Sequence, residues 1–198
     1  MNVVGLVLAA GSGSRLGMPK AVVEIDGERL VDRAVRTLRA GGCAAVIVVL
    51  GAAEVPVPGA AVVLNPDWAT GMGSSLRVGL AALPADADAA VVQLVDQPLI
   101  GGEVVARLIA AHAAGAAVAV ATYAGKRRNP VLLARSTWPE VSELAVGDQG
   151  ARPYLAAHPE AITAVPCDDL GAPDDIDTPA DLARFRGVAD GGGNANGR

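Results

Sequence analysis

The chain has 198 residues, a hydrophobic content of 52% and a formal net charge of −5, which suit one folded domain and exclude a disordered chain. Its only two cysteines are Cys43 and Cys167, so a disulfide scaffold is excluded and a cytoplasmic location is expected. The acidic balance argues against nucleic acid as a partner. The uncharged stretch over residues 108–125 is rich in Ala and Gly, so no membrane association is predicted.

Apolar runs alternate with helical spacing along the chain. Runs bounded by turn residues predict strands over residues 3–10, 21–25, 44–50, 62–64, 89–95, 116–122, 130–134 and 161–165. Between the strands at 116–122 and 130–134, residues 126–128 are expected to form a basic turn. Helical periodicity predicts helices over residues 30–40, 74–83, 103–114, 137–145, 151–157 and 179–186.

This alternation predicts an α/β fold, a three-layer sandwich with a mostly parallel, Rossmann-like central sheet. We expect a single domain over residues 1–187, followed by a Gly- and Asn-rich tail over residues 188–198 that is disordered. Ligands of such sheets bind at the carboxyl ends of the strands. The loops that follow residues 10, 64, 95 and 165 are therefore the places to look for a site.

A glycine-rich loop follows the first strand and reads LAAGSGSRLGMPK. Its glycines let successive backbone N–H groups form a concavity that suits phosphate. Arg15 can hydrogen-bond phosphate oxygens with its fork of donors, and Lys20 supplies a mobile point charge. The loop therefore predicts a binding site for a nucleoside triphosphate.

Two commoner phosphate motifs do not fit this loop. A Walker A loop and a GxGxxG dinucleotide fingerprint both require glycine at positions where Leu16 or Met18 stands. Pro19 would also lie inside the first helix of a dinucleotide fold, where it is disruptive. A dinucleotide-binding loop and a solvent loop with incidental charges remain as alternatives.

Six segments, in order along nearly the whole chain, resemble a known family. The loop resembles the signature LAAGxSxRMGxxK of the GT-A-like NTP transferases. Five further segments resemble the molybdenum cofactor cytidylyltransferase branch of the MobA-like members: GMGSSLRVGL (71–80), VVQLVDQPLI (91–100), NPVLL (129–133), GDQGAR (147–152) and DIDTPADL (175–182). The resemblance implies a GT-A-type nucleotidyltransferase fold and CTP as the nucleotide substrate.

A magnesium site is expected where Asp96 ends a strongly apolar strand, because Mg²⁺ prefers one or two carboxylates plus phosphates. The alternative is that Asp96 caps the next turn. The resemblance points to Asp177, ahead of Asp175, as the second metal ligand, with Mn²⁺ as an alternative ion. Asp177 precedes Thr178 and a proline, so it is equally suited to cap the last helix.

The resemblance also implies which residues bind the nucleotide. Ala9-Ala10-Gly11 has the form of the cytidylyl branch, in which the methyl group of Ala10 would fill space that a purine needs. Ser74 and Ser75 have an ordinary alternative as helix starters. The expected nucleotide set is Leu8, Ala9, Ala10, Gly11, Gly13, Ser14, Arg15, Lys20, Asn65, Gly71, Met72, Gly73, Ser74, Ser75 and Asp96.

The phosphorylated acceptor is expected to contact the second half of the chain. The implied residues are Asn129, Pro130, Gly147, Asp148, Gly150 and Arg152. Asn129 stands where the family usually has histidine, and a surface turn is the alternative for residues 147–152. Trp68 lies near Gly71 in the sequence and is a candidate to line the pocket, although five aromatic residues in the whole chain make base stacking a minor expectation.

The combined expectation is transfer of CMP from Mg·CTP to the phosphate of molybdopterin, with Arg15, Lys20 and Asp96 as the catalytic residues. Charge neutralisation and positioning would carry the reaction. The product would pass to a molybdoenzyme or its maturation chaperone. Alternatives are transfer of a cytidylyl or guanylyl group to a sugar or alcohol phosphate, a dinucleotide-dependent oxidoreductase, and a nucleotide-binding regulator without chemistry.

Overall fold

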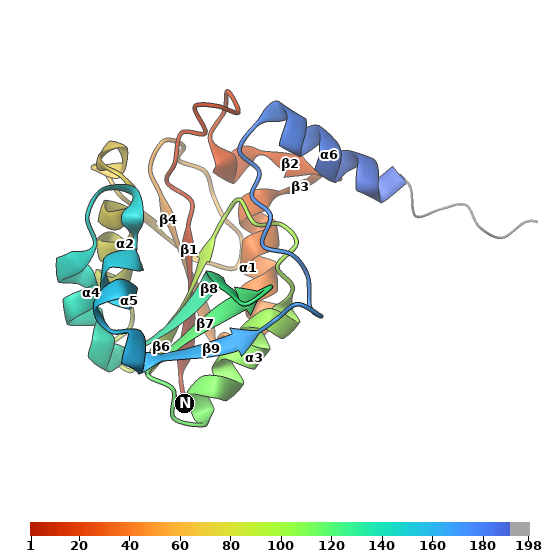
Figure 1. Cartoon of the computed structure of the whole chain (residues 1–198). Coiled ribbons are helices and arrows are strands. Elements are labelled where there is room, and N and C mark those ends of the chain that lie inside the picture. Colours follow the sequence, from red (N-terminus) through yellow and green to blue (C-terminus); the bar gives the residue numbers. More distant parts are fainter. Residues whose placement is uncertain (191–198) are drawn as a thin grey trace, which may run out of the picture.

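The computed structural model describes residues 1–190, which form an α/β fold around one seven-stranded sheet (Figure 1). The strand order is β5-β4-β1-β6-β8-β7-β9, and β8 alone in this sheet runs antiparallel to its neighbours. The strands are β1 (Val3–Leu8), β4 (Ala45–Leu50), β5 (Ala61–Leu64), β6 (Ala89–Leu94), β7 (Val118–Tyr123), β8 (Lys126–Ala134) and β9 (Ile162–Pro166). The expected mostly parallel sheet is therefore confirmed.

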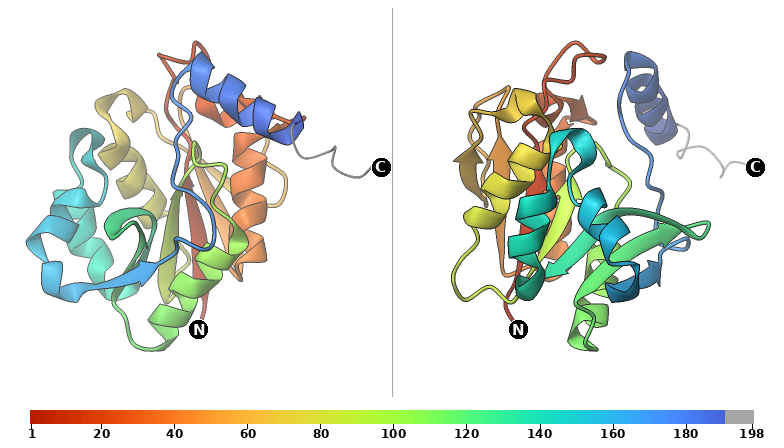
Figure 2. Two further views of the ribbon diagram at one scale, coloured as in Figure 1. Left: turned by 45° about the vertical axis from the view of Figure 1, so that its right-hand side comes forward. Right: turned by 60° about the vertical axis from the view of Figure 1, so that its left-hand side comes forward.

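Helices cover both faces of the sheet and make the three layers (Figure 2). One core forms beneath α1 and α3, and the other beneath α2, α4 and α5. All six residues of β1 are buried because the strand is covered on both faces. The helices are α1 (Leu30–Ala40), α2 (Met72–Ala81), α3 (Gly102–Ala113), α4 (Trp138–Leu144), α5 (Arg152–Ala157) and α6 (Pro179–Asp190).

The expected strand over residues 21–25 is wrong. The chain forms a 3-10 turn, η1 (Lys20–Val22), and then a two-residue strand, β2 (Glu24–Ile25), which pairs antiparallel with β3 (Glu28–Arg29). Residues 21, 23 and 25 are buried and their neighbours less so, which imitates the period of a strand. Asp26 and Gly27, with φ of 54° and 78°, make the tight turn of this short hairpin.

The expected basic turn over residues 126–128 is also wrong, because β8 already begins at Lys126 and pairs with β7 there. The turn lies earlier, at Ala124 and Gly125, which both have positive φ. Two residues with positive φ match the twist of a tight hairpin. The charged side chains of residues 126–128 are exposed along the strand.

The C-terminal helix is longer than expected. It continues to Asp190, so residues 188–190 of the expected disordered tail are helical, and the remainder of that tail lies outside the described residues. Thr178 and Asp181 cap this helix: the N–H of Asp181 donates to Thr178 Oγ1 and the N–H of Thr178 donates to Asp181 Oδ2, at 3.2 and 2.9 Å. Over residues 1–190 no helix is long and apolar enough to cross a membrane.

Candidate active site

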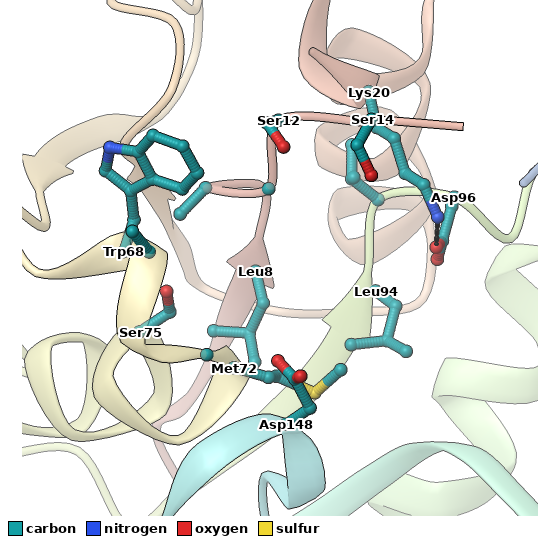
Figure 3. A pocket seen from close by; sticks show the side chains of 15 residues that line it. Leu8, Ser12, Ser14, Lys20, Trp68, Met72, Ser75, Leu94, Asp96 and Asp148 are labelled. Carbon is teal, nitrogen blue, oxygen red and sulfur yellow. Dashed lines mark hydrogen bonds and ion pairs between the residues drawn. The ribbon is translucent and has the colours of Figure 1, made fainter. Parts of the chain in front are cut away.

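A cavity of about 460 Å³ opens at the carboxyl ends of β1 and β6 (Figure 3). The glycine-rich loop, the start of α2 and the turn η4 (Gly147–Gln149) surround it. Ten residues expected to bind nucleotide, metal or acceptor line it: Leu8, Ala10, Gly11, Ser14, Lys20, Gly71, Met72, Ser75, Asp96 and Asp148. The cavity therefore lies where the sheet-end rule places ligands.

An ion cluster closes one end of this cavity. Lys20 Nζ lies 2.5 Å from Asp96 Oδ2 and 2.6 Å from Asp177 Oδ1, and Arg15 Nη2 lies 3.0 Å from Asp177 Oδ2. Burial opposes the charged form of Lys20, yet the two carboxylates outweigh it and raise its pKa above the usual value. The hydrogen bond from Lys20 lowers the pKa of Asp177. Lys20 and Asp177 thus stabilise each other in their charged forms.

Asp177 contributes to this cluster and does not cap α6, since Asp181 and Thr178 perform the capping. Its carboxylate is free to face Lys20 and Arg15. Of the two roles that the sequence left open for Asp177, the structure therefore rules out the cap.

Asp175 lies beside the cluster and makes a different contact. Gln97 Nε2 donates to Asp175 Oδ1 at 2.8 Å, and Asp175 and Lys20 form no ion pair in the described part of the chain. The residue is exposed as a whole, but desolvation of its carboxyl group and the charge of Asp96 raise its pKa. Asp175 is therefore the weaker candidate for a cation ligand.

The residues fit a divalent cation that arrives with a polyphosphate. Asp96 Oδ1 is buried and has no hydrogen-bond partner in the described part of the chain, which is costly for a carboxylate oxygen unless a ligand satisfies it. Among the side chains of residues 1–186, which the structure describes, no group of three or more His, Cys, Asp or Glu is arranged to hold a metal alone. Two carboxylates completed by phosphate oxygens suit Mg²⁺ or Mn²⁺.

Several residues expected to bind the nucleotide are buried behind the cavity wall and do not line the cavity. Asn65 is only 1% exposed, and its Nδ2 donates to Ser74 Oγ at 2.8 Å and to Ser75 Oγ at 3.0 Å. Only Ser75 of these three reaches the cavity wall. Asn65 and Ser74 thus hold the loop before α2 against the first turn of the helix. Ala9, Gly13, Arg15 and Gly73 also do not line the cavity.

The turn η4 packs tightly on the start of α2. A Cβ at Gly71 would lie 2.5 Å from Gly147 O, and one at Gly73 would lie 2.8 Å from Ala145 O. Gly71 also has a φ of 113°, which favours glycine. These close approaches bring Asp148 into the larger cavity, although the sequence placed it on the acceptor side.

A smaller cavity of about 50 Å³ adjoins the first and shares the walls Leu8, Met72 and Leu94 with it. Three of the expected acceptor residues, Asn129, Gly150 and Arg152, line this second space. Pro130 and Gly147 line neither cavity. The shared walls place a candidate acceptor site directly beside the candidate nucleotide site.

A model of the MobA-like NTP transferase domain matches residues 5–162. The chain belongs to this family. It is therefore a nucleotidyltransferase of the MobA-like type with the GT-A-like fold that the sequence predicts.

Among the relatives of this MobA-like chain, nicotine blue oxidoreductase of Paenarthrobacter nicotinovorans is 36% identical over 197 residues, which cover 92% of this chain and 96% of the relative. A solved homologue of the Mycobacterium tuberculosis protein Rv0371c, from Mycobacterium sp. strain JC1, is 31% identical with a TM-score of 0.81, covering 95% of this chain and 96% of that one. Rv0371c of M. tuberculosis H37Rv, crystallised with manganese, is 26% identical with a TM-score of 0.77, covering 94% and 99%.

The structure adds site residues of this MobA-like chain that the sequence did not single out. Ser12, Ala69, Leu94 and Val95 line the larger cavity, and Trp68 lines it as expected. Ser12 lies between expected loop residues, and Leu94 and Val95 directly precede Asp96. The positions of these three residues at the ends of β1 and β6 were the available signal, whereas Ala69 lies in the 3-10 turn η2 (Trp68–Thr70) beside Trp68.

Proposed function

We propose that the chain transfers CMP from Mg·CTP to the phosphate of molybdopterin, forming molybdopterin cytosine dinucleotide and pyrophosphate. The observation that supports this most is the cluster of Lys20, Asp96 and Asp177 at one end of a cavity of about 460 Å³. Cations that can hold phosphates and carboxylates that can hold a divalent ion meet there, beside a glycine-rich loop.

In the proposed reaction an oxygen of the acceptor phosphate forms a bond to the α-phosphorus of CTP, and the bond from the α-phosphorus to the bridging oxygen breaks. The acceptor phosphate is already anionic, so no general base is required. Lys20 and Arg15 would neutralise charge on the α-phosphate and on the leaving pyrophosphate. Asp96 and Asp177 would hold the metal ion, which when bound supplies Lewis-acid charge neutralisation.

A pyrimidine donor is supported by Ala10, which is 5% exposed and lines the cavity. Its methyl group takes up space at the end of β1 that a purine would need. The segments shared with the cytidylyl branch support the same choice. The Ala10→Gly variant is expected to gain binding of GTP relative to CTP, by a factor of about ten at most.

The phosphate group of the acceptor would bind at the smaller cavity, where Arg152 and Asn129 offer hydrogen-bond donors. Molybdopterin is proposed from the resemblance of the segments, and a molybdoenzyme or its maturation chaperone is the proposed recipient of the product. A sugar or alcohol phosphate is the alternative acceptor for the same chemistry.

A second candidate function is a redox activity at the same site. It is favoured by one observation, the name nicotine blue oxidoreductase carried by a relative that is 36% identical over nearly its whole length. Transfer of a nucleotidyl group is nevertheless favoured, because it uses a lysine between two carboxylates beside a phosphate-binding loop, as Lys20 lies between Asp96 and Asp177. A hydride transfer makes no use of paired carboxylates.

Thermal-shift measurements with CTP, GTP and NAD, each with and without Mg²⁺, test the proposal. We expect CTP with Mg²⁺ to stabilise the protein most, because ligands that bind the native state raise its apparent stability. Stabilisation by NAD alone would favour the redox candidate. Equal stabilisation by GTP and CTP would remove the cytidine preference.

A further inference from the structure

We infer that Asp148 recognises the base of the nucleoside triphosphate. Its carboxylate accepts a hydrogen bond from an exocyclic amino group and disfavours a base with a carbonyl at that position. The inference rests on the proposed function, since it assigns a role within the CTP site. It concerns a residue that the sequence placed with the acceptor phosphate.

A carboxylate is a poor partner for phosphate, because like charges repel and a carboxylate only accepts hydrogen bonds. The structure places Asp148 in the larger cavity, whereas Gly150 and Arg152 of the same segment line the smaller one. Arg152 is therefore a better ligand for the acceptor phosphate than Asp148 is.

The charges of the larger cavity fix the direction in which a nucleotide enters. Lys20 lies at the end with Asp96 and Asp177, so the phosphates belong there and along the glycine-rich loop. Figure 3 shows Asp148 across the cavity from Ser12 and Ser14 of that loop. The base is then directed toward Asp148, Ser75 and Trp68, away from the cations.

Asp148 is held in place by the packing of its turn. A Cβ at Gly71 would lie 2.8 Å from Asp148 Oδ1, so the carboxylate sits against the start of α2, where the helix dipole favours an anion. The turn is fixed further by Gly150, where a Cβ would lie 3.0 Å from Met72 Sδ. The Asp148 carboxylate accepts no hydrogen bond from the side chains or backbone of residues 1–186, so its acceptor capacity is available to a ligand.

Cytosine and uracil differ in the group that this carboxylate would meet. Cytosine presents the N4 amino donor, whereas uracil presents the O4 acceptor, as thymine does. Asp148 would pair with the first and repel the second. A charge-assisted hydrogen bond of this kind is worth about a factor of ten or more in affinity.

The test is equilibrium binding of CTP and UTP by calorimetry, with Mg²⁺ and without acceptor, to the full chain and to Asp148→Asn and Asp148→Ala. We expect the wild type to prefer CTP by about tenfold or more. In Asp148→Asn, CTP should weaken and UTP should tighten, because the amide can donate to O4. Asp148→Ala should lose the preference. Glu143→Gln, which removes an exposed charge on α4, is the control and should bind as the wild type does.

The outcomes separate this inference from the proposed function. A wild-type preference for CTP that both Asp148 variants retain would overturn the role of Asp148 and leave the proposed function intact. An equal loss of CTP and UTP binding in the variants would mark Asp148 as merely structural and would also overturn the inference. Failure of the wild type to bind either nucleotide would overturn the proposed function and the inference together.

Discussion

Lys20 Nζ lies 2.6 Å from Asp177 Oδ1 and thereby joins the glycine-rich loop to the segment before α6, 157 residues later in the chain. The same ammonium group lies 2.5 Å from Asp96 Oδ2. A monovalent cation of the protein thus occupies the space between the two carboxylates proposed to hold a divalent one. Phosphates of an incoming nucleotide would compete for Lys20 and leave the carboxylates to the metal ion.

Lys20→Met should therefore tighten the binding of a divalent cation in the absence of nucleotide, by about tenfold, because Asp96 loses its cation and Asp177 keeps only Arg15. Pyrophosphate release should at the same time fall by about 10²- to 10³-fold, since a preorganised cation is lost. Mn²⁺ binding can be followed by electron paramagnetic resonance. Lys126→Met, which removes an exposed charge on β8, is the control, and an unchanged Mn²⁺ affinity in Lys20→Met would contradict the competition.

The ion pair should also give stability a characteristic dependence on pH. The pKa of Asp177 is lowered by Lys20, so its contribution is present above the ordinary carboxyl pKa of about 4 and is lost as the pH falls below it. The pKa of Lys20 is raised, so its contribution is present below its ordinary pKa of about 10.4 and is lost as the pH rises beyond it.

Asp177→Asn should lower the free energy of unfolding on the order of 1 kcal/mol between about pH 5 and about pH 9. The difference from the wild type should shrink toward both extremes. Urea unfolding at a series of pH values measures this, with Asp174→Asn as a neighbouring control. A difference that stays constant from acid to alkaline pH would show that the pair does not stabilise the fold.

Gly71→Ala should weaken nucleotide binding more than backbone strain alone explains, because the added methyl group would collide with Gly147 and Asp148. Gly115→Ala is the matched control. Gly115 has a φ of 107°, close to the 113° of Gly71, and nothing lies within 4 Å of its Cβ position. Both variants should lose about 1 to 2 kcal/mol of stability from the positive φ, but only Gly71→Ala should lose CTP affinity. Equal CTP affinities for the two variants would refute the docking of η4 on α2.

Asn65→Ala should destabilise the protein by about 1 to 3 kcal/mol, because the buried hydroxyl groups of Ser74 and Ser75 lose their donor. Nucleotide binding should weaken as the first turn of α2 loosens. Asn2→Ala removes an amide that bonds Asp86 at the surface and should cost less than about 0.5 kcal/mol. Thermal unfolding of the two variants, with and without CTP, provides the comparison.

Residues whose environment is decided by local pattern could be predicted from the sequence. The apolar runs of β1 and β6 are buried on both faces, and Asp96 follows directly after such a run, so the sheet and the position of the site could be predicted together. The short apolar run at residues 21–25 misled for the same reason, because such a run also occurs in a 3-10 turn followed by a short hairpin.

Contacts between distant segments could not be predicted in this way. Nothing local in the sequence indicates that Lys20 meets Asp177. The spacing of Thr178 and Asp181, by contrast, is the local signature of a capping box and indicates that Asp177 is not needed as the cap. The position of Asp148 depends on the close approach of Gly71 and Gly147, which is set by tertiary packing. The sequence therefore predicted most of the residues that line the larger cavity, but it did not predict that Asp148 lies among them.

The central claim, CMP transfer at the cluster of Lys20, Asp96 and Asp177, is tested most directly by pyrophosphate release with molybdopterin as acceptor and each of the four nucleoside triphosphates in turn. We expect release with CTP and Mg²⁺, and a loss of about 10²-fold or more in Asp96→Asn, whose near-isosteric side chain should preserve the fold. Wild-type activity in Asp96→Asn, or no release with any of the four nucleotides, would contradict the account.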